Sequence, residues 1–355
     1  MSDSPLRVGI VGCGAFGRRA YALNLADHPD AVIAALCDRD GARAEALARD
    51  LIDDYGVERR PSVYTDYAEM IVGESLQVVT VATMADVRPA VSVAALESGA
   101  HVLVAKPMAS SMSEADRMLD AARRADRTLM VGYNYRFRDD ATVLHRFIRD
   151  GGLGSPLFAR AWSHVASVAI SGPHYIKAVS GGGSLASTAI HVIDLAVWFL
   201  GRPSIDSVHG QVNSRFSGLP SLPPDVEAVR DDYDTEDLAT GFVRFKDGVS
   251  MSVEAMWLAP PQVQSEGVDV WGTEGYASLA PLRLLSWRDG SYVDRTEEVA
   301  PGLAASFVDD NPLRWRREVL PFIDCALGRT TPIVTEEEMR ADQAIMDGVY
   351  SAPSA

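Results

Sequence analysis

Residues 7–17 read RVGIVGCGAFG, an apolar run interrupted by glycines at the spacing G-x-G-x-x-G. In such a segment Gly12 permits the tight turn from strand to helix, Gly14 lets backbone N–H groups approach a pyrophosphate, and Gly17 lets the helix pack close to the strand. The glycine spacing alone is a weak signal, because glycine-rich turns also occur without a ligand. The neighbouring segments therefore decide what this one means.

The segments that flank the glycine run complete a dinucleotide-binding pattern. Residues 8–11 are predicted to form a buried strand, residues 16–27 a helix, and residues 31–37 a second strand that ends at Asp38. A carboxylate about 20 residues after the last glycine is suited to accept hydrogen bonds from ribose hydroxyls. It would also repel a 2′-phosphate and so favours NAD, whereas Arg39 is able to neutralise such a phosphate and leaves NADP open.

Length and composition indicate a folded chain with two domains. A chain of 355 residues is longer than a domain built on a single hydrophobic core usually is. A content of 47% hydrophobic and 23% charged residues is ordinary for a globular protein. The formal net charge of -16 disfavours nucleic acid and anionic membranes as partners and is compatible with a cationic substrate.

The N-terminal residues and the cysteines indicate a cytoplasmic protein. No basic segment followed by an apolar core opens the sequence, and no apolar run reaches the roughly 20 residues that span a bilayer. Cys13, Cys37 and Cys325 lack metal-ligand spacing, so we expect them to be reduced and structural, and we expect no metal site.

Residues 6–133 alternate between strand and helix patterns, which predicts a doubly wound parallel sheet of the Rossmann type. Further strands are predicted at residues 78–82, 101–105 and 129–133, and helices at residues 44–55 and 87–97. Another helix is predicted to begin with Ser113 and Glu114 in the manner of a capping box. The first domain is therefore assigned to residues 1–133.

Residues 134–355 are predicted to form an α+β domain with a mostly antiparallel open sheet and a closing helix near residues 335–350. Residues 238–245 and 249–257 are strand-like and are joined by Lys246, Asp247 and Gly248, a typical hairpin turn. Before them, residues 220–237 carry seven acidic side chains against the single base Arg230. A solvated surface loop is favoured there over a lid that contacts substrate.

Residues that follow the predicted parallel strands are the first candidates for a binding site, because ligands bind at the carboxyl ends of such strands. Lys106 follows a buried strand and would present its ammonium group beside the nicotinamide, where it could stabilise an alkoxide; an ordinary surface lysine is the alternative. The candidate cofactor-binding residues are Gly12, Gly14, Ala15, Phe16, Gly17, Asp38, Arg39, Thr83 and Lys106.

A second group of candidates lies in residues 181–194, which read GGGSLASTAIHVID. As a helix, this segment directs its aliphatic residues to one face and Ser187, His191, Asp194 and Trp198 to the opposite face. A histidine with an aspartate one turn away is suited to accept the proton of an alcohol. A plain exposed helix face is the alternative.

The order of these motifs resembles the Gfo/Idh/MocA family of NAD(P)-dependent oxidoreductases, named after glucose-fructose oxidoreductase, inositol dehydrogenase and rhizopine catabolism. The resemblance rests on the glycine run, Lys106-Pro107, residues 133–137 (YNYRF), the triple glycine with H-x-x-D, and residues 271–275 (WGTEG), and covers nearly the whole chain. It implies a Rossmann domain followed by an antiparallel α+β domain, substrates that are sugars, cyclitols or related polyols, and homodimers or homotetramers built through the open sheet.

The resemblance also implies roles for individual residues. Lys106 matches the lysine of a Glu-Lys-Pro motif, His191 the acid/base position, and Asp194 a substrate-binding acid. The candidate substrate-binding residues are Lys106, Tyr133, Arg136, His191 and Asp194, together with His174, Tyr175 and Lys177, which are placed only by their proximity to the glycine run. Four residues depart from the pattern: Ala105 replaces a glutamate, Ser187 replaces an aspartate, and Met84 and Arg88 replace a proline and a histidine.

These features together predict an oxidoreductase. The expected reaction is hydride transfer between NAD(P) and a secondary alcohol or ketone of a sugar, amino sugar or cyclitol, with catalysis by Lys106 and His191. The acidic composition favours an amino sugar. Two alternatives stay open: a non-catalytic regulatory protein that binds a dinucleotide or sugar, motivated by the changes at 105 and 187, and an enzyme that reduces an unsaturated or imine bond.

Overall fold

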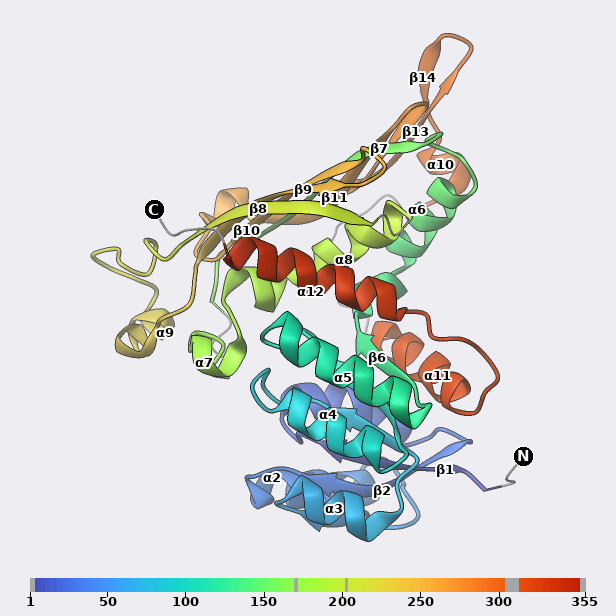
Figure 1. The fold of residues 1–355 in the computed structure, drawn as a ribbon, viewed down its shortest axis with the longest axis vertical. Helices are drawn as coiled ribbons and strands as arrows, with labels where there is room; N and C mark the ends of the chain where they lie inside the picture. Colours follow the sequence, from blue (N-terminus) through green and yellow to red (C-terminus); the bar gives the residue numbers. More distant parts are fainter. Residues whose placement is uncertain (1–3, 169–171, 202–203, 304–312, 352–355) are drawn as a thin grey trace. The chain divides into compact units, whose positions relative to one another are not determined.

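The structure is a computed structural model that describes residues 4–168, 172–201, 204–303 and 313–351 (Figure 1). The chain divides into two compact units. The Rossmann unit comprises Met1–Tyr133 and Asn311–Met339, and the second unit comprises Asn134–Asp310 and Arg340–Ala355. The sequence pattern assigns residues 1–133 to the first domain and residues 134–355 to the second, whereas the compact units also group residues 311–339 with the Rossmann unit.

The sheet of the Rossmann unit is parallel, and its order within the described residues is β3-β2-β1-β4-β5-β6. The strands are β1 Leu6–Val11, β2 Ala31–Cys37, β3 Ser62–Tyr64, β4 Val78–Val81, β5 His101–Ala105 and β6 Leu129–Gly132. Every residue of β4 and β6 is buried, as expected where helices cover both faces of a parallel sheet. The strand order reverses between β1 and β4, and this is where open α/β sheets bind their ligands. The predicted fold class is confirmed.

The helices of this unit largely follow the predicted pattern. They are η1 Gly17–Ala22, a π-helix, followed by α1 Leu23–Leu25, α2 Gly41–Asp53, α3 Tyr67–Glu74, α4 Arg88–Glu97, α5 Met112–Ala125 and α11 Leu313–Ala326. The predicted start of α5 is wrong by two residues. Ser111 is the N-cap, its Oγ accepts from the backbone N–H of Glu114, and the Glu114 carboxylate accepts from the N–H of Ser110.

Helix α11 explains why residues 311–339 belong to the Rossmann unit. It packs against η1 and α1. Two ion pairs support this packing, Arg316 with Asp27 at 2.8 Å and Arg329 with Asp30 at 2.6 Å. Because these partners are almost 300 positions apart in the sequence, no local pattern indicates the contact.

The sheet of the second unit is mixed and mostly antiparallel, with the order β14-β13-β12-β11-β7-β10-β9-β8 among the described strands. The strands are β7 Pro156–His164, β8 Ile205–Asn213, β9 Leu238–Phe245, β10 Ser250–Met256, β11 Ser265–Gly272, β12 Gly275–Leu279, β13 Leu282–Arg288 and β14 Ser291–Asp294. The hairpin β9–β10 lies where it was predicted, and β7 pairs with β10 in parallel.

Helices cover one face of this sheet (Figure 1). Helix α8, Ile190–Phe199, packs on β7 and β11, and α12, Glu336–Tyr350, contacts β8 and β9 through Val349. The other helices are η2 Asn134–Phe137, α6 Asp139–Arg149, α7 Lys177–Ser180, η3 Leu185–Ala189, α9 Pro224–Glu227, η4 Arg230–Asp232, η5 Pro261–Val263 and α10 Thr296–Val299. The predicted closing helix corresponds to α12.

In the part of the chain that the structure describes, one helical stretch is apolar enough to cross a membrane by length and composition. It is Lys177–Phe199, which contains α7, η3 and α8. Of its apolar 18-residue window, 94% is buried inside the protein, which is the usual environment of a core helix in a globular domain.

Candidate active site

The glycine turn after β1 is closely packed on one side and open on the other. Gly12 has a φ of +96°, and a Cβ there would lie 2.6 Å from the carbonyl oxygen of Ala82. A Cβ at Gly17 would lie 1.9 Å from the carbonyl oxygen of Gly12, whereas a Cβ at Gly14 would meet nothing within 4 Å. The turn thus needs glycine at 12 and 17 for packing and leaves space at Gly14, as a site for pyrophosphate requires.

Asp38 is held across from this turn at the end of β2. Its Oδ2 accepts from the backbone N–H of Cys13 at 2.9 Å, and its Oδ1 accepts from the N–H of Asp40 at 3.0 Å. A carboxylate oxygen has more than one lone pair, so both oxygens can still accept from ribose hydroxyls. Asp38 is half-buried, and Arg39 beside it is exposed. The residues present fit a dinucleotide.

The other predicted cofactor residues lie around the same edge of the sheet. Thr83 follows β4, and its backbone nitrogen would be 3.1 Å from a Cβ at Gly12. Ala15 is exposed, and Phe16 makes an edge-on contact with Tyr21, with ring centroids 5.6 Å apart. Tyr133, a predicted substrate-binding residue that follows β6, is only 1% exposed.

Lys106 directly follows β5 and is half-buried, whereas Ala105 before it is 3% exposed. The Lys106–Pro107 peptide bond is cis. The carbonyl oxygen of Pro107 accepts a hydrogen bond from Nη1 of Arg88 at 2.7 Å. The turn that carries Lys106 is therefore tied to the first residue of α4.

In the second unit the imidazole of His191 stacks on Tyr135. The ring centroids lie 4.2 Å apart at an interplanar angle of 11°, and His191 is 8% exposed. The Tyr135 hydroxyl donates to Oε2 of Glu266 at 3.4 Å. Tyr135 was not among the predicted site residues, although it stands next to Arg136 in the YNYRF segment.

Asp194 forms a buried ion pair with Arg136. Nε of Arg136 donates to both carboxylate oxygens at 3.0 and 2.9 Å, and neither side chain has any exposed surface. The guanidinium also lies 5.3 Å from the ring centroid of Trp198, which stacks on His145. The charge of Asp194 is thus neutralised inside the protein by a partner 58 positions earlier.

The interpretation of α8 as a helix with one polar face is wrong in one respect. All residues from Ile190 to Phe199 are buried, because Arg136, Tyr135 and His145 cover the face that carries His191, Asp194 and Trp198. Ser187, 7% exposed, lies in the π-helix η3, whose wider turn was not part of the predicted helical pattern.

Glu236 holds the N-terminal end of η3. Its carboxylate accepts from the backbone N–H of Gly183 at 2.7 Å, from the N–H of Leu185 at 2.9 Å and from the hydroxyl of Tyr350 at 3.0 Å. A Cβ at Gly182 would lie 2.0 Å from the Tyr350 hydroxyl, and one at Gly183 would lie 2.0 Å from the carbonyl oxygen of Glu236. The glycines are therefore needed for close packing.

The predicted solvated loop at residues 220–237 is wrong for its last three residues. Thr235, Glu236 and Asp237 are buried, and burial raises the pKa of Glu236 and of Asp237 above their usual range. The acidic side chains of this loop that remain exposed are Asp225, Glu227, Asp231, Asp232 and Asp234.

The residues placed near the glycine run are tied to the same loop. Half-buried Tyr175 packs against a small cluster of Val168, Val226 and Trp257. His174 is half-buried, and Lys177 is exposed, with its backbone N–H donating to Oδ1 of Asp234 at 2.5 Å.

Two family models match the chain. Residues 6–133 match the description "oxidoreductase family, NAD-binding Rossmann fold", and residues 142–278 match the "GFO/IDH/MocA C-terminal domain". The chain belongs to the GFO/IDH/MocA oxidoreductase family. This GFO/IDH/MocA protein therefore has an NAD-binding Rossmann domain, as its glycine turn and Asp38 predict.

The relatives of this GFO/IDH/MocA protein include sugar dehydrogenases. It is 27% identical to D-glucoside 3-dehydrogenase of Escherichia coli (strain K12), over 99% of this chain and 96% of the relative. It is 30% identical to D-apiose dehydrogenase of Paraburkholderia graminis, over 82% of this chain and 72% of the relative. The solved structure of levoglucosan dehydrogenase in complex with NADH and levoglucosan has the same fold, with a TM-score of 0.75 at 23% identity and 98% coverage of both chains.

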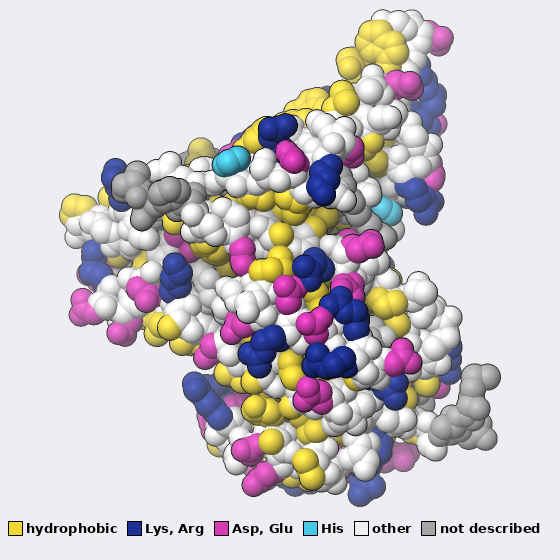
Figure 2. Space-filling model, viewed as in Figure 1, with side chains coloured by type: hydrophobic (Ala, Val, Ile, Leu, Met, Phe, Trp, Pro, Cys, Tyr) yellow, Lys and Arg dark blue, Asp and Glu magenta, His cyan; other side chains and the backbone are white. Residues whose placement is uncertain are grey.

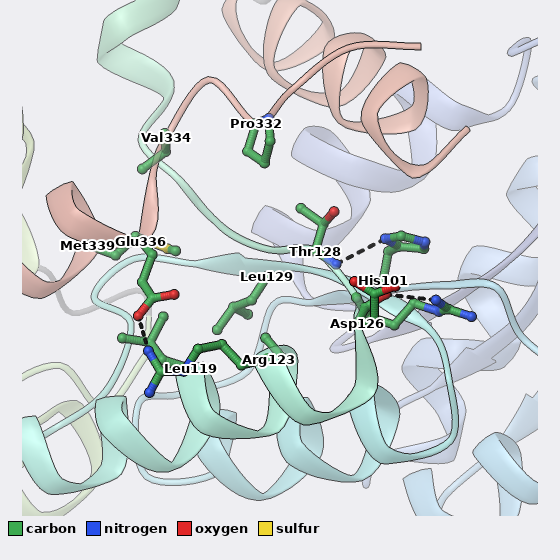
Figure 3. A pocket seen from close by; sticks show the side chains of 12 residues that line it. His101, Leu119, Arg123, Asp126, Thr128, Leu129, Pro332, Val334, Glu336 and Met339 are labelled. Carbon is green, nitrogen blue, oxygen red and sulfur yellow. Dashed lines mark hydrogen bonds and ion pairs between the residues drawn. The ribbon is translucent and has the colours of Figure 1, made fainter. Parts of the chain in front are cut away.

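A cavity of about 570 Å³ lies in the Rossmann unit beside the amino-terminal ends of β5 and β6 (Figure 3). It is lined by His101 and Leu129, which begin β5 and β6, and by Pro332 and Glu336. Glu336 pairs with Arg123, and Nδ1 of His101 accepts from the N–H of Thr128. Because cofactors bind at the carboxyl ends of parallel strands, this cavity is not the candidate active site.

Proposed function

We propose that this GFO/IDH/MocA protein transfers a hydride between NAD and a carbinol or ketone carbon of a sugar, amino sugar or cyclitol. NAD, when bound, supplies the hydride acceptor or donor. Lys106 donates a hydrogen bond to the reacting oxygen and stabilises the negative charge that develops on it. His191 removes the hydroxyl proton during oxidation and returns it during reduction.

The stacked, buried imidazole of His191 is the observation that carries this proposal. A general base works best when one orientation is held in advance, and the parallel contact with Tyr135 restricts the ring. Arg136 satisfies the neighbouring carboxylate of Asp194, so the pair adds little net charge near the imidazole. The sugar-dehydrogenase relatives support the same reaction class.

The identity of the sugar is open to direct test with a panel of compounds. Neutral pyranosides, amino sugars and cyclitols are incubated with NAD or NADP, and the absorbance of the reduced nicotinamide is followed. Oxidation of at least one class supports the proposal. Tight NAD binding without turnover of any compound, in either direction, contradicts it and favours a regulatory binding protein.

The amino-sugar part of the proposal rests on the exposed acids of residues 220–237. Asp237 is buried and Asp194 is paired with Arg136, so neither supplies a free negative charge. Long-range attraction of an ammonium group by the exposed acids is screened by salt. If kcat/KM for an amino sugar does not fall with ionic strength, this part is wrong.

We also propose that the protein is a cytoplasmic homodimer or homotetramer. The sheet of the second unit and its hairpin β13–β14 expose Phe242, Trp271, Trp287 and Tyr292, and apolar side chains are visible at the tip of this hairpin (Figure 2). Exposed aromatic groups of this kind are typical of protein interfaces. Light scattering on the purified chain tests the proposal, and a monomer at micromolar concentration would contradict it.

A further inference from the structure

Arg88 is a buried cation that forms no ion pair with an acidic side chain among the described residues. It begins α4, is 5% exposed, and donates through Nη1 to the carbonyl oxygen of Pro107. Its Nε is buried and has no hydrogen-bond partner among the described residues. No carboxylate in the described part of the chain forms an ion pair with it.

This arrangement is unfavourable for stability. Burial lowers the pKa of Arg88 to about 10, which reflects the loss of hydration around the guanidinium. The positive end of the α4 dipole lies at the same place and adds to the unfavourable interaction. A buried, uncompensated charge is destabilising, so an apolar side chain would serve a plain packing role better.

The side chains that act electrostatically on Arg88 are Tyr21 and Asp86, and neither compensates its charge inside the protein. Tyr21 on η1 is fully buried, its hydroxyl has no partner among the described residues, and both Arg88 and Glu318 influence it electrostatically. Glu318 on α11 is fully buried, and its Oε1 would lie 2.5 Å from a Cβ at Gly132. Burial raises the pKa of the Glu318 carboxyl to about 8, which leaves it mostly neutral at pH 7. Asp86, also close, is exposed.

We propose that Arg88 is a positioning residue for Lys106. Its guanidinium holds the carbonyl oxygen of Pro107, one residue after Lys106. The turn held in this way keeps the Lys106 side chain in one direction at the end of β5. The catalytic consequence rests on the function proposed above. The positioning of Lys106 by Arg88 does not depend on that function, and it can be measured without a substrate.

The lysine content of the chain makes this measurement simple. Lys106, Lys177 and Lys246 are the only lysines in the sequence, and the structure describes all three. Lys177 and Lys246 are exposed and lie in the second unit, so they serve as internal references. Brief acylation of the intact native protein, followed by mass spectrometry of its peptides, gives a labelling rate for each lysine.

Arg88→Met is the informative variant, and Arg124→Met, an exposed arginine of α5, is the matched control. We expect Arg88→Met to label Lys106 about threefold faster or more, because a freed turn exposes the amine more often, while Lys177 and Lys246 keep their rates. The melting temperature should stay the same or rise, because an uncompensated charge has been removed. Arg88→Lys should be intermediate.

Two results would overturn the proposal. One is an unchanged Lys106 rate in Arg88→Met; the other is faster labelling of all three lysines with a lower melting temperature, which indicates general loosening. Activity is measured separately on Arg88→Met and on Lys106→Ala. Full turnover of Lys106→Ala refutes the catalytic role of Lys106 but leaves the positioning by Arg88 intact, so the two failures are distinguishable.

Discussion

The ring of Tyr135 lies parallel to the imidazole of His191, with centroids 4.2 Å apart. Such a contact is worth about 0.5–1.5 kcal/mol and restricts rotation of the imidazole. We expect Tyr135→Ala to lower kcat about tenfold, because His191 is then less often in a productive orientation. Tyr135→Phe retains the ring and should keep most of the activity. Steady-state kinetics on both variants test this, and equal kcat in Tyr135→Ala and the wild type would contradict it.

Glu236 should matter for stability because it is the shared acceptor of three donors at the start of η3. Glu236→Gln leaves a single oxygen acceptor and places an amide N–H against another donor. We expect a loss of about 1–3 kcal/mol in the free energy of unfolding, measured by urea denaturation. Asp231→Asn, at an exposed acid of the same loop, is the control and should change little. Equal losses in both variants would refute this role.

Because the carboxyl of Glu318 is buried, we expect the free energy of unfolding to depend on pH. Burial raises the pKa of its carboxyl from 4.5 to about 8 in the folded protein, so the folded state binds the proton more tightly than the unfolded state. Its contribution to stability is fully present below pH 4.5 and is lost progressively as the pH rises to about 8. Glu318→Gln, which cannot ionise, should therefore be more stable than the wild type at pH 8, by up to several kcal/mol.

Chemical denaturation at pH 5 and pH 8 measures this difference. The wild type should lose more stability than Glu318→Gln between the two pH values. Parallel changes in the two proteins would show that Glu318 does not titrate in this range.

Asp38 should set the choice of cofactor. Asp38→Ala removes the acceptor for the ribose hydroxyls and the repulsion of a 2′-phosphate. We expect NAD affinity to fall about tenfold or more and NADP affinity to fall less or to rise. Calorimetric titration of NAD and of NADP into the wild type and into Asp38→Ala measures these affinities. If the wild type binds NADP more tightly than NAD, the preference inferred from Asp38 is wrong.

The Rossmann unit could be predicted from the sequence because its signals are local. The glycine run, the buried strands and Asp38 lie within about 40 consecutive residues, and each has a fixed place in a βα unit. The same alternation of strand and helix patterns predicted β5 and placed Lys106 directly after it. The short strand β3 and helix α3 were missed, since three residues of strand leave almost no periodic pattern.

The environment of His191 could not be predicted in the same way. The ring stacked on His191 belongs to Tyr135, and the partner of the neighbouring Asp194 is Arg136, both more than 50 positions earlier. The helix end is held by Glu236 and Tyr350, much later in the chain. From the sequence alone, an acidic run is predicted to be solvated, because the hydrogen-bond donors to buried Glu236 come from distant parts of the chain. Arg88 is a similar case, because its bond to Pro107 depends on where α4 begins relative to β5.

The central claim is that Lys106 and His191 carry the chemistry of a sugar or cyclitol dehydrogenase. The most direct measurement is kcat for Lys106→Ala and His191→Ala on the best substrate of the panel, followed by the absorbance of reduced nicotinamide. We expect each variant to lose a factor of about 100 or more in kcat, while NAD affinity in His191→Ala stays close to that of the wild type. Near wild-type turnover in both variants would contradict the claim.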